Sequence, residues 1–175
     1  MSDDSKVAYV SPKAAVSPVS ALQIRDEPDL PYVRFLEGFH FKLIHADVEA
    51  GLWVVRTRIA PGVTLPTHKH TGEVFALTLS GAWKYLEHEE MNVAGTYLYE
   101  PAGSVHTLHT PATNTSITDA WFAIRGANLN LNDDGTVESV WDASFNIETY
   151  MRLCREEGHP EPQFIRKGWP NTPSV

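Results

Sequence analysis

Short runs of β-forming residues, separated by tight turns, fill the middle of this 175-residue chain. The run at 39–45 alternates apolar with polar side chains, the period of two that a half-buried strand requires. The runs that we expect to be strands are 32–36, 39–45, 52–60, 74–79, 83–86, 96–99, 105–109, 117–125 and 137–141. Most of them are bounded by Gly, Pro, Asn or acidic residues. Many short strands of this kind indicate a single all-β domain, a sandwich or a barrel.

One helix is expected near the C-terminus, with Asn146 as its N-cap. Its apolar positions, spaced for one helix face, are Ile147, Tyr150, Met151 and Cys154. Gly158 and Pro160 should end it. We expect this face to pack on the barrel, or to close one of its mouths. The expected organisation is an N-terminal arm (1–29), the barrel (30–142), and a helix with an extended tail packed on the barrel (143–175).

Composition narrows the choice of partner and compartment. The formal net charge of −8 argues against a nucleic-acid partner, since phosphate would be repelled. The single cysteine, Cys154, allows neither an internal disulfide nor a cysteine-rich zinc site, and it fits a reducing compartment. The N-terminus is polar, and no window approaches the roughly 18 apolar residues of a membrane span. We therefore expect a cytoplasmic protein that binds neither nucleic acid nor membrane.

Three histidines have the spacing of a metal site. His68 and His70 flank Lys69, and alternate residues of a strand project to the same side. Pro66 favours an extended chain just before them. A turn at 101–104 then precedes His106, so a third imidazole can come from a neighbouring strand. Two ligands on one strand and one on the next leave open positions on the ion, as a catalytic metal needs.

Two motifs around these histidines resemble the paired motifs of the cupin family. The first comprises Gly62, His68, His70, Glu73 and Gly81, and the second Gly95, Pro101, Gly103 and His106. The amino-acid sequence of residues 70–87 and 99–108 resembles that of one subgroup, the 2,4'-dihydroxyacetophenone dioxygenase-like cupins. The resemblance implies a jelly-roll-like β-barrel and non-haem Fe(II) held by the three histidines. Zinc or another divalent metal is the alternative, because imidazole suits several metals.

The same resemblance implies an activity. Enzymes of this subgroup use O2 to cleave a carbon–carbon bond beside a carbonyl. The implied substrate is a small aromatic α-hydroxyketone such as 2,4'-dihydroxyacetophenone, which would give 4-hydroxybenzoate and formate, or a related diketone. Three neutral imidazoles leave the charge of the ion uncompensated, which favours an anionic, chelating substrate. Cupins often pair, so a homodimer or homotetramer is expected.

Two glutamates require separate treatment. Glu73 has the opposite strand parity from His70, so it should point away from the metal unless Gly72 forms a bulge. Glu100 precedes the turn that carries His106, and it is our candidate catalytic residue, as a base or as a partner that orients a histidine. The alternative for Glu100 is an ordinary surface carboxylate. Thr110 stands where the second motif usually has asparagine.

Further candidates are weaker, and other functions remain open. Several aromatic residues could wall a pocket or simply form core: Trp53, Phe75, Tyr85, Tyr97, Tyr99, Trp121 and Phe122. The remaining histidines of the central region, for which we expect no role at the metal, are His40, His45, His88 and His109. The competing functions are a zinc-binding sensor module like the cupin parts of anti-sigma factors, and a non-redox cupin isomerase or lyase.

Overall fold

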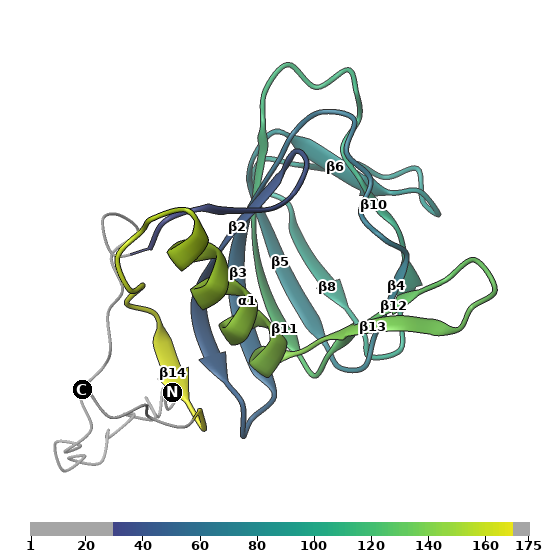
Figure 1. The fold of residues 1–175 in the computed structure, drawn as a ribbon. Coiled ribbons are helices and arrows are strands. Elements are labelled where there is room, and N and C mark those ends of the chain that lie inside the picture. The colour runs from purple at the N-terminus through teal and green to yellow at the C-terminus, as the bar shows by residue number, and fades with distance from the viewer. Residues whose placement is uncertain (1–29, 170–175) are drawn as a thin grey trace, which may run out of the picture.

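The computed structural model describes residues 30–169, so the expected N-terminal arm and the last six residues of the tail lie outside the described part. Strands dominate this part, and one helix follows them (Figure 1). The elements are β1 (Val33–Leu36), β2 (Phe39–Asp47), β3 (Leu52–Ile59), β4 (His68–His70), β5 (Val74–Ser80), β6 (Ala82–Tyr85), β7 (Asn92–Val93), β8 (Tyr97–Glu100), β9 (Val105–His106), β10 (Leu108–His109), β11 (Thr118–Arg125), β12 (Asn128–Leu131), β13 (Val137–Trp141), α1 (Ala143–Glu156) and β14 (Ile165–Lys167). The prediction of a single, mainly β domain with a C-terminal helix is confirmed.

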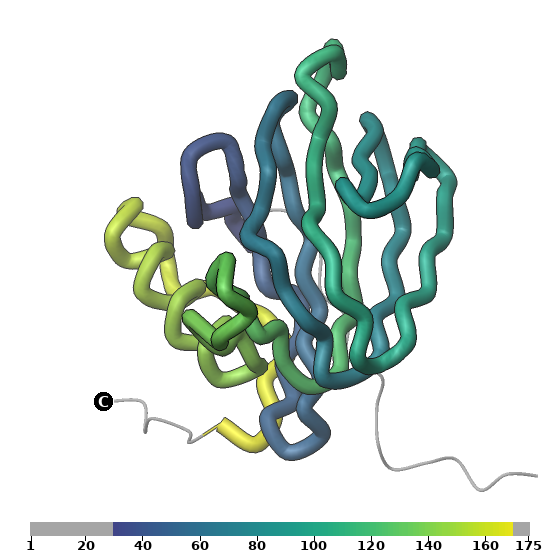
Figure 2. The backbone as a smooth tube through the Cα atoms, turned by 90° about the vertical axis from the view of Figure 1, so that its right-hand side faces the viewer, coloured from purple at the N-terminus to yellow at the C-terminus, as the bar shows by residue number. Residues whose placement is uncertain are grey.

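The strands form one large sheet and two small ones. The large sheet has the order β1-β2-β3-β11-β5-β8, with β14 added alongside β2. The small sheets have the orders β10-β6-β7 and β13-β12-β4-β9. The small sheets lie over one face of the large one (Figures 1 and 2). The sheets are not joined into one continuous closed barrel, so the barrel is an open, three-sheet version of the expected fold.

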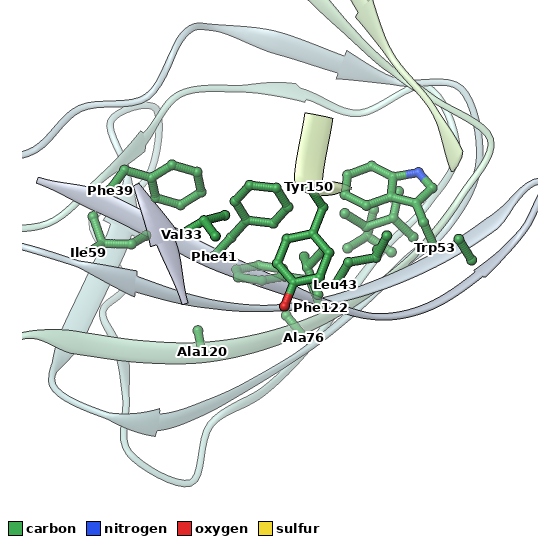
Figure 3. Packing of buried hydrophobic residues seen from close by; sticks show 14 of the residues in the cluster. Val33, Phe39, Phe41, Leu43, Trp53, Ile59, Ala76, Ala120, Phe122 and Tyr150 are labelled. Atoms are coloured by element: carbon green, nitrogen blue, oxygen red, sulfur yellow. The ribbon is translucent and has the colours of Figure 1, made fainter. Parts of the chain in front are cut away.

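The core lies on the inner face of the large sheet. The strands β3, β11 and β5 are antiparallel, and Val55 lies opposite Phe122 and Phe122 opposite Ala76. Every second residue of β3, β11 and β5 therefore points inward, as alternation requires. Figure 3 shows Phe39 and Phe41 following one another along β2 on this side. All five side chains are buried, and they give the interior an apolar wall.

The opposite face of the large sheet is partly polar. Arg56 donates to both carboxylate oxygens of Asp119 on the neighbouring strand, at 2.7 and 2.9 Å. Arg58 lies 3.5 Å from the same carboxylate. The two arginines and Asp119 thus form a cross-strand cluster on this face.

Thr110 stabilises the turn that leads toward the first histidines. Its hydroxyl donates to the carbonyl of Ala60 at 2.6 Å, and its own carbonyl accepts from the amide of Gly62 at 2.8 Å. Gly62 has a φ of +81°, a conformation that favours glycine. Thr110 therefore forms the hydrogen bonds at the motif position that usually holds asparagine.

The prediction that Asn146 caps the helix is wrong. The N-cap is Asp142, whose carboxylate accepts from the amide of Phe145, and the helix begins at Ala143. Asn146 lies inside the first turns, where its side-chain amide donates to the carbonyl of Asp142 at 2.8 Å. Both residue types cap helices well, so the type alone could not separate them.

The apolar face of the helix packs as expected. Ile147, Tyr150 and Cys154 are buried, and the helix lies against β2, as Figure 2 also shows. The Tyr150 hydroxyl donates to the carbonyl of Pro31 at 2.7 Å. Gly158, with a φ of +76°, follows the helix end. Residues 30–169 contain no helix with the length and apolar character needed to cross a membrane.

Three strands had no counterpart in the prediction: β7, β12 and β14. The strand β12 pairs with β4 on one side and β13 on the other, so it is part of the small sheet that carries all three histidines. Asn128 and Asn130 disguise it, because asparagine is poorly represented in strands. The strand β14 lies within the expected extended tail and pairs in parallel with β2.

Candidate metal centre

The three histidines of the motifs come together on two adjacent short strands. His68 and His70 are buried on β4 while Lys69 between them is exposed. His106 on β9 lies directly opposite His68 in the antiparallel register. The centroids of the three rings are 4.8 to 5.0 Å apart. One nitrogen from each ring lies within 4.8 Å of the others, close enough to share a metal ion.

Backbone hydrogen bonds fix the turn that brings His106 to this place. The amide of Gly103 donates to the carbonyl of His70 at 2.8 Å, and the amide of His70 donates to the carbonyl of Ser104 at 3.0 Å. Gly103 has a φ of +91°, which a residue with a side chain rarely adopts. The turn is thus attached to the strand that carries the other two histidines.

Contacts behind two of the rings set their orientation. Nδ1 of His68 donates to the carbonyl of Pro66 at 2.8 Å, which leaves the lone pair of Nε2 free for a metal. The ring of His106 stacks on that of Tyr85, with centroids 3.8 Å apart and planes 16° from parallel. Both imidazoles therefore have fixed positions before any ligand binds.

Glu100 lies beside the histidines and not on the surface. Its side chain is buried, and Oε2 lies 3.1 Å from Nε2 of His70 and 3.0 Å from Nε2 of His106. The Tyr85 hydroxyl donates a short hydrogen bond to the other oxygen, Oε1. The surface alternative for Glu100 is therefore excluded, and its catalytic role remains a prediction.

Glu73 points away from the histidines, as its parity predicted. Its carboxylate accepts from the exposed Tyr99 hydroxyl at 3.4 Å, and it is not part of the group that could hold a metal. The backbone at Gly72 passes so close to the carbonyl of Arg125 that a Cβ atom would overlap it. A carboxylate from β8, Glu100, thus occupies the region that Glu73 does not reach.

Burial and charge set the protonation of the metal-free site. Burial, followed by the charge of His70, lowers the pKa of His68 to about 4, so this ring is neutral at pH 7. Burial alone would raise the pKa of Glu100, but its contacts with His106 and His70 lower it well below the usual range. The site therefore offers a neutral imidazole and a carboxylate anion at neutral pH.

Unpaired donor atoms at this place fit a divalent cation. Three buried atoms have no hydrogen bond of good geometry: Nδ1 of His70, Nε2 of His106 and Oε2 of Glu100. The short distances from Glu100 to the rings are thus close approaches of atoms that do not point at each other correctly. Buried polar atoms are normally paired, so an ion among them would resolve the deficit. Imidazole ligands suit Fe(II) and zinc alike.

A cavity leads from the histidines into the apolar interior. Its volume for the centres of water-sized molecules is about 80 Å³, which is room for several waters or a small organic ring. His68, His70 and Glu100 line one part of it. The aromatic residues that line it are Phe35, Phe39, Phe41, Trp53, Tyr85, Phe122, Trp141 and Phe145. Edge-to-face contacts of Phe35 with Trp141 and Phe145 form the end next to the helix.

Only some of the aromatic residues that were candidates for the pocket wall line the cavity. Trp53, Tyr85 and Phe122 line the cavity, whereas Tyr97 and Tyr99 are exposed. Phe75 and Trp121 are not among the lining residues either. Sequence analysis missed Phe35, Trp141 and Phe145, although the β-pattern at 39–45 had already marked Phe39 and Phe41 as inward. Three asparagines were missed as well: Asn128, Asn130 and Asn146.

The other histidines lie apart from the group, as expected. His88 is exposed in the turn after β6. His109 exchanges a hydrogen bond with the Thr64 hydroxyl at 2.8 Å. His40 and His45 lie on β2 and are not among the residues that could hold the ion.

The fold and the paired histidine motifs define a cupin. A family model described as the ChrR cupin-like domain matches residues 21–121, more than half of the chain, and the protein belongs to this family. Among curated proteins, none matches the chain by sequence.

Solved structures agree with this assignment. A protein of unknown function with a cupin-like fold from Ralstonia eutropha JMP134 is 34% identical, covers 85% of this chain and 98% of its own, and has a TM-score of 0.74. An RmlC-like cupin from the same organism is 24% identical, covers 83% and 94%, and has a TM-score of 0.76. An acetylacetone dioxygenase from Acinetobacter johnsonii is 18% identical, covers 83% and 98%, and has a TM-score of 0.66. At these low identities the last two show the fold alone.

Proposed function

We propose that the chain is a non-haem Fe(II) dioxygenase that cleaves the carbon–carbon bond beside the carbonyl of an aromatic α-hydroxyketone. The observation that carries the proposal is the meeting of three imidazoles and one carboxylate at a cavity walled by aromatic rings. His68, His70 and His106 would hold the metal. The acetylacetone dioxygenase with the same fold adds support, because its name denotes an activity of the same general kind.

The cavity suits the substrate class. Its walls are mainly aromatic and aliphatic, which favours an apolar ring over a sugar or a free amino acid. The carbonyl end of the ligand would then face the histidines. A bound ring also excludes water from the reacting end of the cavity.

Glu100 is the residue that would move the proton. It is held ionised, and the Tyr85 hydroxyl occupies Oε1, so Oε2 is the oxygen free to act. In this proposal Oε2 accepts the proton that leaves the carbon bearing the hydroxyl when the ketone becomes an enediolate. A carboxylate with a lowered pKa is a weak base, so the substrate itself must be made more acidic.

A bound Fe(II) would supply that acidity as a Lewis acid and would allow the reaction with O2. The overall equation balances: one ArCOCH2OH and one O2 give one ArCOOH and one HCOOH. The bond between the carbonyl carbon and the carbinol carbon breaks, and each carbon gains one oxygen atom. No further reductant is required.

The test is oxygen uptake by chain loaded anaerobically with Fe(II), with 2,4'-dihydroxyacetophenone as substrate. We expect one O2 consumed for each 4-hydroxybenzoate and formate, measured with an oxygen electrode and chromatography. Glu100→Gln should lower kcat by about 100-fold or more, as expected for loss of a general base. Glu73→Gln is the matched control, because this glutamate points outward, and it should leave turnover unchanged. Absence of uptake with this compound and with a panel of enolisable ketones would refute the proposal.

A zinc-binding sensor module is the second candidate, favoured by the family description, which derives from ChrR. The same histidines would then hold zinc, and binding of a small molecule would be read by a partner protein. Zinc without iron in metal analysis of the purified chain, together with absence of oxygen uptake after iron loading, would favour this candidate. Turnover under strictly anaerobic conditions would instead favour a non-redox isomerase or lyase.

A further inference from the structure

Asn128 is a buried polar residue at the cavity that the proposed reaction does not use. It lies on β12, opposite His70 of β4 and opposite Trp141 of β13 in the antiparallel pairings. It therefore lies between the metal-binding end and an aromatic wall of the cavity, and it is among the residues that line this space. The residue is only 8% exposed.

The side chain of Asn128 lacks a partner that its neighbours have. Its Oδ1 is buried and accepts no hydrogen bond. Asn130, two residues further along the same strand face, donates through Nδ2 to the Ser139 hydroxyl at 2.9 Å. Asn146, the third asparagine of the cavity, donates to the carbonyl of Asp142 at 2.8 Å. Two of the three amides are thus used to hold the fold, and the third is not.

An unpaired amide oxygen inside a protein is unfavourable, because it has lost its hydrogen bonds to water without replacement. Apolar residues of similar size would be more stable at such a position. The cost is removed when a ligand brings a hydrogen-bond donor to the oxygen. The position of Asn128 on the cavity wall makes the ligand of this cavity the natural source of that donor.

We propose that Asn128 determines specificity by hydrogen-bonding a hydroxyl group of the substrate. This inference rests on the proposed function and narrows its substrate class to hydroxylated ketones. Oδ1 requires a donor, and a hydroxyl supplies one, whereas the carbonyl oxygens of a simple diketone do not. A half-turn of the amide would present its NH2 group, and a hydroxyl can accept from that group too. A ligand hydroxyl therefore pairs with either end of the amide, whereas a carbonyl oxygen pairs only with the NH2 group and leaves Oδ1 without a donor.

Two positions of the hydroxyl fit a residue placed between His70 and Trp141. One is the carbon next to the carbonyl, and the other is the aromatic ring. Three small ketones separate these cases: 2-hydroxyacetophenone, 4'-hydroxyacetophenone and acetophenone, which has no hydroxyl. Their binding to zinc-loaded chain can be measured by calorimetry without turnover.

The wild-type chain should bind at least one hydroxylated ketone more tightly than acetophenone. Asn128→Leu, which keeps the number and branching of the side-chain heavy atoms, should weaken binding of that ketone about 10-fold or more, a typical effect of losing a buried hydrogen bond. Its affinity for acetophenone should stay the same or rise. Asn128→Asp keeps an acceptor oxygen and provides a second variant, which should retain the preference for the hydroxylated ketone.

Asn130→Ala is the control, because its amide bonds to Ser139 and it should alter the affinities for all three ketones by similar factors. Thermal unfolding of each variant checks that it is folded. Equal affinity of the wild-type chain for all three ketones, or equal weakening of all three in Asn128→Leu, would overturn the proposal. These outcomes are independent of oxygen uptake: uptake without a hydroxyl preference would leave the dioxygenase standing, and a preference without uptake would leave the recognition standing.

Discussion

Removal of one hydroxyl, in Tyr85→Phe, tests how the carboxylate beside the histidines is held. The hydroxyl donates to Oε1 of Glu100 in the interior. Phenylalanine keeps the ring, so the stack on His106, with its 3.8 Å centroid distance, should survive. The change therefore removes a hydrogen bond to a charged group and leaves that oxygen unpaired, which costs about 2–3 kcal/mol. For a chain of this size the midpoint of thermal unfolding should fall by about 4–12 °C.

Two other tyrosines give the scale for this measurement. Tyr150→Phe removes a hydrogen bond from a buried hydroxyl to a neutral carbonyl, which should cost about 1 kcal/mol. Tyr99→Phe removes an exposed hydroxyl and should change stability by about 0.5 kcal/mol or less. Urea unfolding should be done with a chelator present, because a bound metal adds its own stabilisation. The reasoning fails if Tyr85→Phe is no more costly than Tyr99→Phe.

Three further predictions concern protons, metal and backbone. Without metal, His68 has a pKa of about 4 in the folded chain against 6.5 as its ordinary value, so the unfolded chain binds more protons between these pH values. The contribution of neutral His68 to the free energy of unfolding is therefore fully present above pH 6.5. On acidification to pH 4 the free energy of unfolding should fall by up to about 3 kcal/mol. Urea titrations at several pH values should show a shallower dependence in His68→Gln and an unchanged one in His88→Gln. Zinc at about 100 times its dissociation constant should stabilise the chain by about 2.7 kcal/mol in thermal unfolding, and His106→Ala should abolish this gain. Gly72→Ala should cost about 1–3 kcal/mol in urea unfolding, because its new methyl group would overlap the backbone of Arg125; an unaltered midpoint would contradict the close packing.

The strands and the histidine cluster could be predicted because their signals are local. Alternation of apolar side chains marked the inward residues of 39–45, and the spacing of His68 and His70 placed both rings on one side of a strand. The orientation of Glu73 followed from the same parity. Each of these inferences requires only the geometry of a single extended segment.

The rest depended on how distant segments pair. Glu100 and Tyr85 meet only because β8 and β6 belong to different sheets that face the same interior. The strand β12 alternates asparagine with leucine, which would place the leucines inward, yet Asn128 and Asn130 are the buried residues. This orientation becomes visible only from the pairing of β12 with β4. The start of the helix was wrong by about one turn because Asp142 and Asn146 are equally good caps by residue type.

The residues that line the cavity come partly from within the stretch that the family model covers and partly from beyond it. The family model covers residues 21–121, which include all three histidines and Glu100. Asn128, Trp141 and Phe145, which also line the cavity, come after that stretch. Members of the family can thus share the histidine cluster and differ in the ligand that the cavity accepts. A chimera that exchanges residues 122–146 between two members should transfer ligand preference while leaving metal affinity with the recipient.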